Sequence, residues 1–269
     1  MTTADSETGA TARTPPPRAP TFLNYAHTAV AWPLVALYTV LMGTLSLACS
    51  PFDRRGRGQH WCASTWSRMI ARTALLRVRV RGGEHLRAGE SYVFLSTHQS
   101  WMDIPVMLGY LPSQLRIAAK REVFLIPFLG WHMRRAGYIP INRGSTAESI
   151  ESLRRAARAL GGGVSAFLFP EGTRSRDGSL QPLKKGGFRL ALESGLPVVP
   201  VTIVGTRGAM PRGSLALRAG RVEMHIAPPV PTDGLTDEDL PDLMRRVREA
   251  MLEHFESRQQ AVRQVDSRQ

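Results

Sequence analysis

Two side chains that could act together on a proton, His98 and Asp103, stand five positions apart in this sequence. They belong to the segment Ser-Thr-His-Gln-Ser-Trp-Met-Asp at residues 96–103. An imidazole can take a proton from a hydroxyl group, and a carboxylate hydrogen-bonded to it fixes its tautomer and stabilises the imidazolium. The competing interpretation is a helix-capping histidine beside an unrelated aspartate. Because so short a pattern recurs by chance, its context must decide.

A second polar segment, Phe-Pro-Glu-Gly-Thr-Arg-Ser, occupies residues 169–175. Its Gly172 would let a ligand approach the backbone closely. The side chains of Thr173, Arg174 and Ser175 are donors suited to phosphate. The same residues could instead form a purely structural turn. The phosphate interpretation is favoured because the segment directly follows an apolar run typical of a buried strand.

Each candidate follows a stretch that resembles a strand. Residues 92–97 lead into His98, and residues 164–169 lead into the second polar segment. Open α/β sheets bind their ligands beyond the carboxyl ends of their strands. Arg143 also ends an extended stretch, and a capping box that starts at Ser145 opens a helix just after it. A helix N-terminus with an adjacent arginine is a natural anion site, although a lone arginine can equally be a solvated surface residue.

Strands and helices alternate from residue 76 onward, which predicts an α/β fold with a mostly parallel central sheet covered by helices. Strands are expected at residues 76–82, 92–97, 116–120, 137–143, 164–169, 198–205 and 221–227. Helices are expected at residues 122–135, with a break at Pro127, and at 145–160, 186–194 and about 236–256. The apolar spacing of the last helix places its leucines, valine, methionines and phenylalanine on one face.

The N-terminal part of the chain has a different character. Residues 1–20 are rich in Thr, Ala and Pro without hydrophobic periodicity, and we expect a disordered tail. From Thr28 to Phe52 no charged residue occurs. Roughly 20 apolar residues are enough to cross a bilayer. This segment is therefore predicted to bind the membrane, either by spanning it or as a helical hairpin within one leaflet.

Five arginines and one aspartate follow between Asp53 and Arg72. Together with Trp61 and Trp66 they indicate a basic amphipathic helix at the membrane interface, in preference to a core helix with a solvated arginine face. Arginines after the apolar segment place the remaining chain on the cytoplasmic side of the cell membrane or inner membrane. The predicted organisation is a tail at 1–20, membrane-associated helices at 21–75, an α/β domain at 76–256 and a flexible tail at 257–269.

The composition limits the partners. The formal net charge of +13 favours polyanions, but the arginines are scattered and no zinc-finger spacing or RNP-type motif occurs. Membrane headgroups and phosphate-bearing substrates are therefore expected, and nucleic acid is not. The two cysteines, Cys49 and Cys62, have no metal-ligand spacing. Neither a metal site nor a disulfide framework is expected, and a reducing cytosolic setting fits.

Taken in order, the polar segments resemble the motifs of the glycerolipid acyltransferases, the PlsC-like enzymes. The family's Asn-His-x4-Asp motif is similar to residues 97–103, with Thr97 in place of Asn. Its Gly-to-Arg motif is similar to residues 137–143, with Pro140 and Asn142 as departures. Its Phe-Pro-Glu-Gly-Thr-Arg-Ser motif is matched in full at 169–175, and its Val-Pro-Val-x-Ile strand at 199–203. The resemblance covers about residues 76–230.

The resemblance implies a role for each matching residue. His98 would be the general base, Asp103 its orienting carboxylate, and Glu171 would orient the glycerol end of the acceptor. The remaining substrate-binding positions would be Lys120, Arg143, Gly172, Thr173, Arg174 and Pro200. Backbone N–H groups near the start of the helix after His98 would stabilise the tetrahedral oxyanion.

The activity implied by the resemblance is acyl transfer from a thioester to the free hydroxyl of 1-acyl-glycerol-3-phosphate, which forms phosphatidic acid. The donor would be acyl-CoA or acyl-carrier protein, with no other cofactor. Another lyso-lipid, such as a lyso-ornithine lipid, or glycerol-3-phosphate is the alternative acceptor. The apolar run at residues 123–133 could line an acyl tunnel or the membrane-facing rim, although plain core is favoured.

Two rival functions are weaker. A serine hydrolase would need a Gly-x-Ser-x-Gly elbow, which the chain lacks. A non-catalytic lipid-binding module would use the apolar segment and the arginines, but it would not need His98 and Asp103 together. An acyltransferase is therefore the favoured interpretation.

Overall fold

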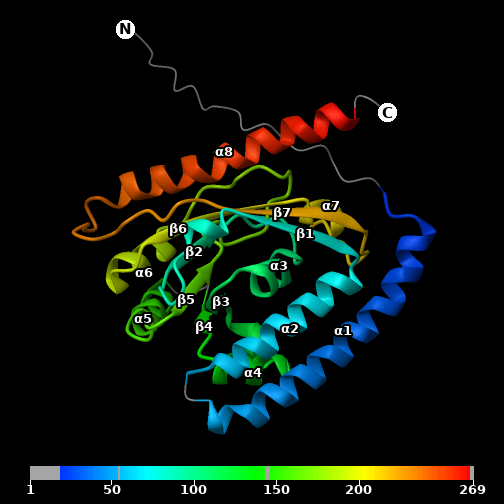
Figure 1. The fold of residues 1–269 in the computed structure, drawn as a ribbon, viewed down its shortest axis with the longest axis horizontal. Coiled ribbons are helices and arrows are strands. Elements are labelled where there is room, and N and C mark those ends of the chain that lie inside the picture. Colours follow the sequence, from blue (N-terminus) through cyan, green and yellow to red (C-terminus); the bar gives the residue numbers. More distant parts are fainter. Residues whose placement is uncertain (1–18, 54, 143–145, 267–269) are drawn as a thin grey trace.

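The computed structural model of the chain describes residues 19–53, 55–142 and 146–266. Arg143 and Ser145 lie outside the described residues, as does nearly all of the tail predicted at 1–20. Figure 1 shows a central sheet with helices on both of its sides. The predicted α/β class with an N-terminal helical segment is therefore confirmed.

Seven strands form the sheet, in the order β1-β7-β6-β2-β5-β3-β4. Their bounds are Leu76–Arg81 (β1), Val93–Ser96 (β2), Gln114–Lys120 (β3), Ile139–Ile141 (β4), Val164–Leu168 (β5), Val198–Val204 (β6) and Gly220–Ile226 (β7). Every neighbouring pair is parallel except β6 with β7. The predicted mostly parallel sheet is thus confirmed. Strands β5 and β6 flank β2, so their carboxyl ends meet at one edge of the sheet.

Helices cover both faces. Their bounds are Phe22–Cys49 (α1), Arg57–Thr73 (α2), Asp103–Tyr110 (α3), Leu129–Arg135 (α4), Thr146–Ala157 (α5), Gly186–Ser194 (α6), Thr206–Ala209 (α7) and Leu240–Asp266 (α8), with short 3-10 turns at Ser50–Phe52, Gly83–His85 and Arg121–Leu125. Side chains alternate along the buried strand β2. Phe94 joins the core beneath α1 to α4, whereas Val93 and Leu95 join the core beneath α5, α6 and α8. In Figure 1, α8 and the pair α1 and α2 lie on opposite sides of the sheet.

The last helix is longer than predicted. It begins at Leu240 and continues to Asp266, ten residues beyond the expected end at Glu256. The predicted stripe is buried at Leu240, Leu243, Val247, Met251 and Phe255. The apolar stripe stops after Phe255, but residues 257–266 include several strong helix formers, which favour continuation of the helix. The end of the apolar stripe therefore does not mark the end of the helix.

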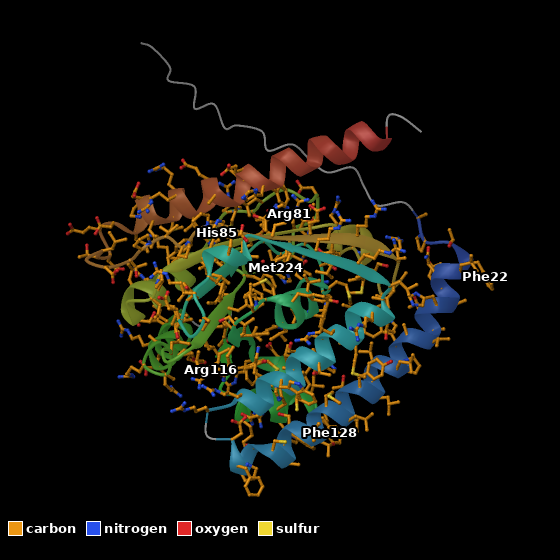
Figure 2. The ribbon with its side chains drawn as sticks, in the orientation of Figure 1. Phe22, Arg81, His85, Arg116, Phe128 and Met224 are labelled. Atoms are coloured by element: carbon orange, nitrogen blue, oxygen red, sulfur yellow. The ribbon has the colours of Figure 1, made fainter. Side chains whose placement is uncertain are left out.

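Helix α1 remains largely uncovered by protein. Residues 22–52 are long and apolar enough to cross a membrane, and only 17% of the most apolar window is buried. The helix passes through Pro33 without ending. Phe22, which is 83% exposed, projects from the start of α1 away from the sheet (Figure 2). This exposed apolar surface is what the sequence predicts for a membrane-binding segment.

Helix α2 combines the two interpretations given for its sequence. One side packs against α1 and α3, and it buries Cys62, Ile70 and Ala71. This side behaves as a core helix, as in the alternative interpretation, and membrane contact stays a prediction for the rest of the helix. Trp61 on the other side is 56% exposed. Only that outer side is available to a membrane surface.

A close contact fixes α1 against the turn that precedes α4. A Cβ atom built on Gly43 would lie 2.8 Å from Phe128 Cβ, which is closer than real atoms approach. One helical turn later, Ser46 Oγ and His132 Nδ1 form a hydrogen bond of 2.6 Å. Glycine at position 43 therefore permits α1 to pack directly on the segment at residues 121–135, which breaks at Pro127 as predicted.

Candidate active site

His98 and Asp103 meet at the carboxyl end of β2, as predicted. His98 follows the strand by two residues, and Asp103 is the first residue of α3. The distance between His98 Nδ1 and Asp103 Oδ2 is 2.9 Å. The Asp103 side chain is fully buried, whereas that of His98 is 11% exposed. The carboxylate is thus shielded from water, while the imidazole is still reachable.

Four donors converge on the Asp103 carboxylate. Besides His98 Nδ1, the backbone N–H groups of Gln99 and Ser100 donate to Oδ2 at 2.7 and 2.8 Å. The hydroxyl of Thr206 donates to Oδ1 at 2.5 Å. A buried carboxylate needs such partners to remain charged. The arrangement fixes the Asp103 carboxylate against the imidazole.

The imidazole of His98 is oriented from two sides. The ring stacks on Phe169 with a centroid distance of 3.7 Å and an interplanar angle of 13°. Because Nδ1 donates to the Asp103 carboxylate, the neutral ring has its lone pair on Nε2. Among the described residues, no hydrogen bond to Nε2 is formed. This nitrogen is therefore available to accept a proton from a ligand.

The predicted oxyanion donors are already engaged. The N–H of His98 donates to Glu171 Oε1, and those of Gln99 and Ser100 donate to Asp103. The N–H of Met102 donates to Ser100 Oγ. The prediction that backbone amides at the start of α3 bind the oxyanion is therefore wrong for these four groups, because the turn uses them to hold its own carboxylates.

The segment at 169–175 forms hydrogen bonds with the backbone of His98, in addition to lying beside the predicted ligand site. The N–H of His98 donates to Glu171 Oε1 at 2.6 Å, and the N–H of Ser175 donates to the His98 carbonyl at 2.8 Å. The other Glu171 oxygen accepts from the N–H of Gln181 at 3.0 Å. Glu171 is 3% exposed, and Ser175 is 1% exposed. Both were predicted to contact the acceptor, but they are structural in this arrangement.

Because Glu171 is buried, its protonation makes the stability of the folded protein depend on pH. Desolvation raises the pKa of this carboxyl group from 4.5 to about 8, although the N–H groups of Gln181 and His98 oppose the rise. A raised acid pKa means that the folded protein holds a proton that the unfolded chain releases. The stability contribution is therefore present below about pH 4.5 and is lost as the pH rises towards about 8.

We expect the thermal midpoint of the wild type, relative to that of Glu171→Gln, to fall between pH 5 and pH 8 and to level off above that range. Scanning fluorimetry of both proteins in mild detergent would measure the difference. The slope should correspond to about 1.4 kcal/mol per pH unit at most. A difference that is independent of pH would contradict the raised pKa.

Gly172, Thr173 and Arg174 lie together beyond the end of β5, as predicted. Gly172 has φ +68°, a conformation that favours glycine, and the Lys184 side chain lies 3.0 Å from where a Cβ would be. Arg174 is placed 5.6 Å above the exposed ring of Trp101. Burial, and after it the charge of Arg212, lowers the pKa of Arg174. The two guanidinium groups therefore lie close enough for their like charges to interact.

Two cavities adjoin at this edge of the sheet. The larger, of about 740 Å³, is mostly apolar and is lined by His98, by α1, α2, α3 and α4, and by much of the run at 123–133. That run was favoured as plain core, but it forms part of a cavity wall. The smaller basin, of about 460 Å³, is lined by Thr173, Arg174, Arg176, Asp177, Gln181 and Arg212. Thr173, Arg174 and Arg212 line both cavities.

The remaining predicted positions lie apart from this junction. Pro200 is buried in β6 opposite Leu95 and lines neither of these two cavities, so its contact with substrate stays a prediction. Its carbonyl accepts from the N–H of Ala227 at the edge of the β7 pairing. Lys120 lies at the rim of the apolar cavity and forms an ion pair of 2.9 Å with Glu122. Arg143 lies outside the described residues.

Three side chains of the site were not predicted. The Thr206 hydroxyl donates a hydrogen bond to the Asp103 carboxylate, and the Phe169 ring stacks on His98. Arg212 lines both cavities and donates to the Arg174 carbonyl at 2.7 Å. Phe169 was inside a quoted motif, but its stacking has no sequence signature. Thr206 lies just after the predicted strand β6, and this position could have identified it as a candidate site residue. Thr97, which stands where the family has Asn, bonds the backbone of Ile203 and thereby ties β2 to β6.

The fold and the site define an α/β domain that brings a general-base candidate, an anion site and an apolar cavity together beyond the carboxyl ends of its strands. Residues 77–204 match the family model described as Acyltransferase. Over this segment, the chain belongs to the acyltransferase family.

Several known proteins are similar to the chain. It is 37% identical over 182 residues to 1-acyl-sn-glycerol-3-phosphate acyltransferase BAT2, chloroplastic, of Brassica napus (66% of this chain, 52% of that protein). It is 36% identical over 181 residues to 1-acyl-sn-glycerol-3-phosphate acyltransferase alpha of Homo sapiens (67% and 64%). The chain thus spans between half and two thirds of the length of these relatives.

A solved structure has the same fold. The crystal structure of the 1-acyl-sn-glycerophosphate (LPA) acyltransferase, PlsC, from Thermotoga maritima superposes with a TM-score of 0.76 at 27% sequence identity. The match covers 87% of this chain and 95% of that one. This structural match therefore extends beyond residues 77–204, the segment that matches the family model.

Proposed function

We propose that the protein transfers a fatty acyl group from an acyl thioester to the free hydroxyl of 1-acyl-glycerol-3-phosphate, forming phosphatidic acid. One observation carries this proposal: His98, held by Asp103, lines an apolar cavity that shares Thr173, Arg174 and Arg212 with an adjoining arginine basin. A lysophosphatidic acid needs both environments, because its headgroup is an anion and its chain is apolar. The names of the similar proteins support the same acceptor.

The chemical step that we propose uses His98 as a general base. Nε2 of His98 takes the proton of the acceptor hydroxyl while the oxygen of that hydroxyl bonds to the thioester carbonyl carbon. The tetrahedral intermediate then collapses, the carbon–sulfur bond breaks with its electron pair on sulfur, and the imidazolium returns the proton to the thiolate. Asp103 stabilises the imidazolium between these two events. The reaction needs no metal ion or redox cofactor, because the thioester already activates the acyl group.

In this proposal the two cavities hold different parts of the substrates. Arg174 and Arg212 line the basin together with Arg176, against the single carboxylate of Asp177, so the basin has an excess of positive charge. It would hold the phosphate of the acceptor, with Thr173 as a further donor. The apolar cavity would hold an acyl chain. Either acyl-CoA or acyl-carrier protein is the donor, since both are anions that suit a chain with a net charge of +13.

Membrane attachment through α1 would place this site beside its lipid substrates. The exposed apolar side of α1 and the outer face of α2, with Trp61, would lie in one leaflet or across the bilayer. Arg57, Arg68 and Arg72 on α2 follow the apolar helix. By the positive-inside rule we propose that the α/β domain lies on the cytoplasmic side of the cell membrane.

Release of a free thiol tests the function. Purified protein in detergent would be mixed with palmitoyl-CoA and a thiol reagent such as DTNB. Thiol release that depends on added 1-acyl-glycerol-3-phosphate is the expected result. Parallel reactions with glycerol-3-phosphate, a lyso-ornithine lipid and another lysophospholipid would identify the preferred acceptor, and acyl-carrier protein thioester would replace palmitoyl-CoA in a second series. Thiol release without any acceptor would indicate a hydrolase and contradict the proposal.

We expect Arg212→Ala to raise the KM for the acceptor about tenfold or more while kcat changes little. Removing one charge-assisted hydrogen bond to phosphate weakens the ground state and the transition state equally. Steady-state kinetics with varied 1-acyl-glycerol-3-phosphate would measure both constants. Arg245→Ala on α8 is the control, because it removes an equal charge from a side chain that is paired with Asp242 and Glu249 and does not line the basin. A change confined to kcat would place Arg212 in the chemical step instead.

A further inference from the structure

The loop between α7 and β7 contacts both helix α1 and the arginine basin. Its residues Met210 and Leu217 are buried, at 1% and 2% exposed, and residues 211–215 between them, the tip of the loop, are partly or fully exposed. The tip contains neither helix nor strand. Arg212 lies in the tip and lines both cavities. A side chain of the basin is therefore carried by a stretch of chain that has little burial to fix its position.

Helix α1 holds this loop by two hydrogen bonds. The Trp32 indole N–H donates to the Leu215 carbonyl at 3.0 Å, and the Leu217 N–H donates to the Thr28 hydroxyl at 2.9 Å. Trp32 and Thr28 are four residues apart, so they lie on the same side of α1. Among the described residues, no other hydrogen bond from outside the loop reaches the backbone of the tip. The backbone that carries Arg212 is therefore held in place by α1.

The loop is also bonded to the two polar segments of the active site. The Ser100 hydroxyl donates to the Met210 carbonyl at 2.7 Å, and the Arg212 guanidinium donates to the Arg174 carbonyl at 2.7 Å. Ser100 lies in the turn that follows His98. The loop thus joins α1 to the turn that holds the base and to the segment that carries Arg174. A shift of the tip would move Arg212 relative to both.

We propose that Trp32 and Thr28 are positioning residues, which hold the loop from α1 so that Arg212 faces the phosphate of the acceptor. The proposal rests on the proposed function, because it assumes that the basin binds that phosphate. Neither residue lines the basin, so their effect on the acceptor passes through the loop. The like charges of Arg174 and Arg212 repel one another. The two bonds to α1 oppose movement of Arg212 out of the basin, and a site that is ordered in advance binds its ligand more tightly.

The test measures two Michaelis constants in Trp32→Phe, which removes the indole N–H and keeps an aromatic ring. We expect the KM for 1-acyl-glycerol-3-phosphate to rise about three- to tenfold, the effect of losing one hydrogen bond, while kcat stays within about twofold. Because Trp32 also lines the apolar cavity, the KM for palmitoyl-CoA is measured in parallel, and it should change by less than about twofold. Thr28→Val, at a position that lines neither cavity, should raise the acceptor KM in the same way.

A double-mutant cycle with Arg212→Ala shows whether the effect acts through Arg212. In the Arg212→Ala background, Trp32→Phe should change the acceptor KM by less than about twofold, because the side chain that Trp32 positions is absent. A merely structural contribution of Trp32 would be additive. Thr73→Val is the matched control for Thr28→Val. The Thr73 hydroxyl bonds Tyr38 of α1 at 3.5 Å, and Thr73 lines neither cavity, so its loss should leave the acceptor KM unchanged.

Equilibrium binding separates this inference from the proposed function. Radiolabelled 1-acyl-glycerol-3-phosphate and the detergent-solubilised protein, without an acyl donor, give a Kd that does not depend on turnover. A weaker Kd in Trp32→Phe, with no further loss in the Arg212→Ala background, would sustain the inference even if no acyl transfer occurred, and the transferase activity would then be rejected. An unchanged KM and Kd in both Trp32→Phe and Thr28→Val, or an equal loss with and without Arg212, would overturn the inference.

Discussion

His98→Ala should lower kcat by at least about two orders of magnitude in the thiol-release assay. The imidazole lines the apolar cavity, and its Nε2 has no hydrogen-bond partner among the described residues, so its loss leaves the acceptor hydroxyl without a base. A positioned general base contributes about 10²- to 10⁴-fold. The KM for the acceptor should change little, because the phosphate contacts lie in the basin.

The fold should survive this change. The bond from the His98 backbone to Glu171 does not involve the imidazole, so alanine preserves it. His85→Ala is a matched control: this histidine bonds the Ile226 carbonyl and lines neither cavity, so its loss should leave kcat unchanged. If His98→Ala kept turnover like that of the wild type, His98 would not be the base.

Asp103→Asn should lower kcat by about tenfold to a hundredfold, which is less than the loss in His98→Ala. Two backbone N–H groups and His98 Nδ1 all donate to Oδ2. They will select the amide oxygen of Asn for that position, while its NH2 group faces the Thr206 hydroxyl. The tautomer of His98 is thereby kept, and only the negative charge that stabilises the imidazolium is lost.

The same assay measures this effect, with Asp239→Asn as a control that neutralises a carboxylate at the start of α8. Thr206→Val should lower kcat less than Asp103→Asn does, because it removes one donor and keeps the charge. A larger loss in Thr206→Val would mean that the position of the carboxylate matters more than its charge.

Sequence patterns predicted those parts of the site whose residues lie close together in the sequence. His98 and Asp103 are separated by one turn, and the segment at 169–175 directly follows β5, so spacing alone brought them to the sheet edge. Arg212 and Thr206 lie over a hundred residues from Asp103. Their contacts depend on the order of strands, in which β6 lies beside β2, and no local pattern encodes that order.

Burial is the other property that spacing could not provide. The family resemblance assigned Glu171 and Pro200 to substrate, but each is enclosed by neighbouring strands or loops. The polarity of a residue does not say whether its partner is a ligand or the backbone. In the same way, the run at 123–133 is apolar whether it fills a core or lines a cavity, and only the packed structure distinguishes the two.

In the proposed function, helix α1 is both the membrane anchor and a wall of the acyl-chain cavity, which has a consequence for protein engineering. Its outer side can be replaced by any lipid-compatible sequence, whereas its inner side must keep Gly43 against Phe128 and Ser46 against His132. A chimera with an unrelated anchor of equal length would still attach to the bilayer, but its cavity would be open on one side. The anchor of this protein is therefore not an interchangeable module.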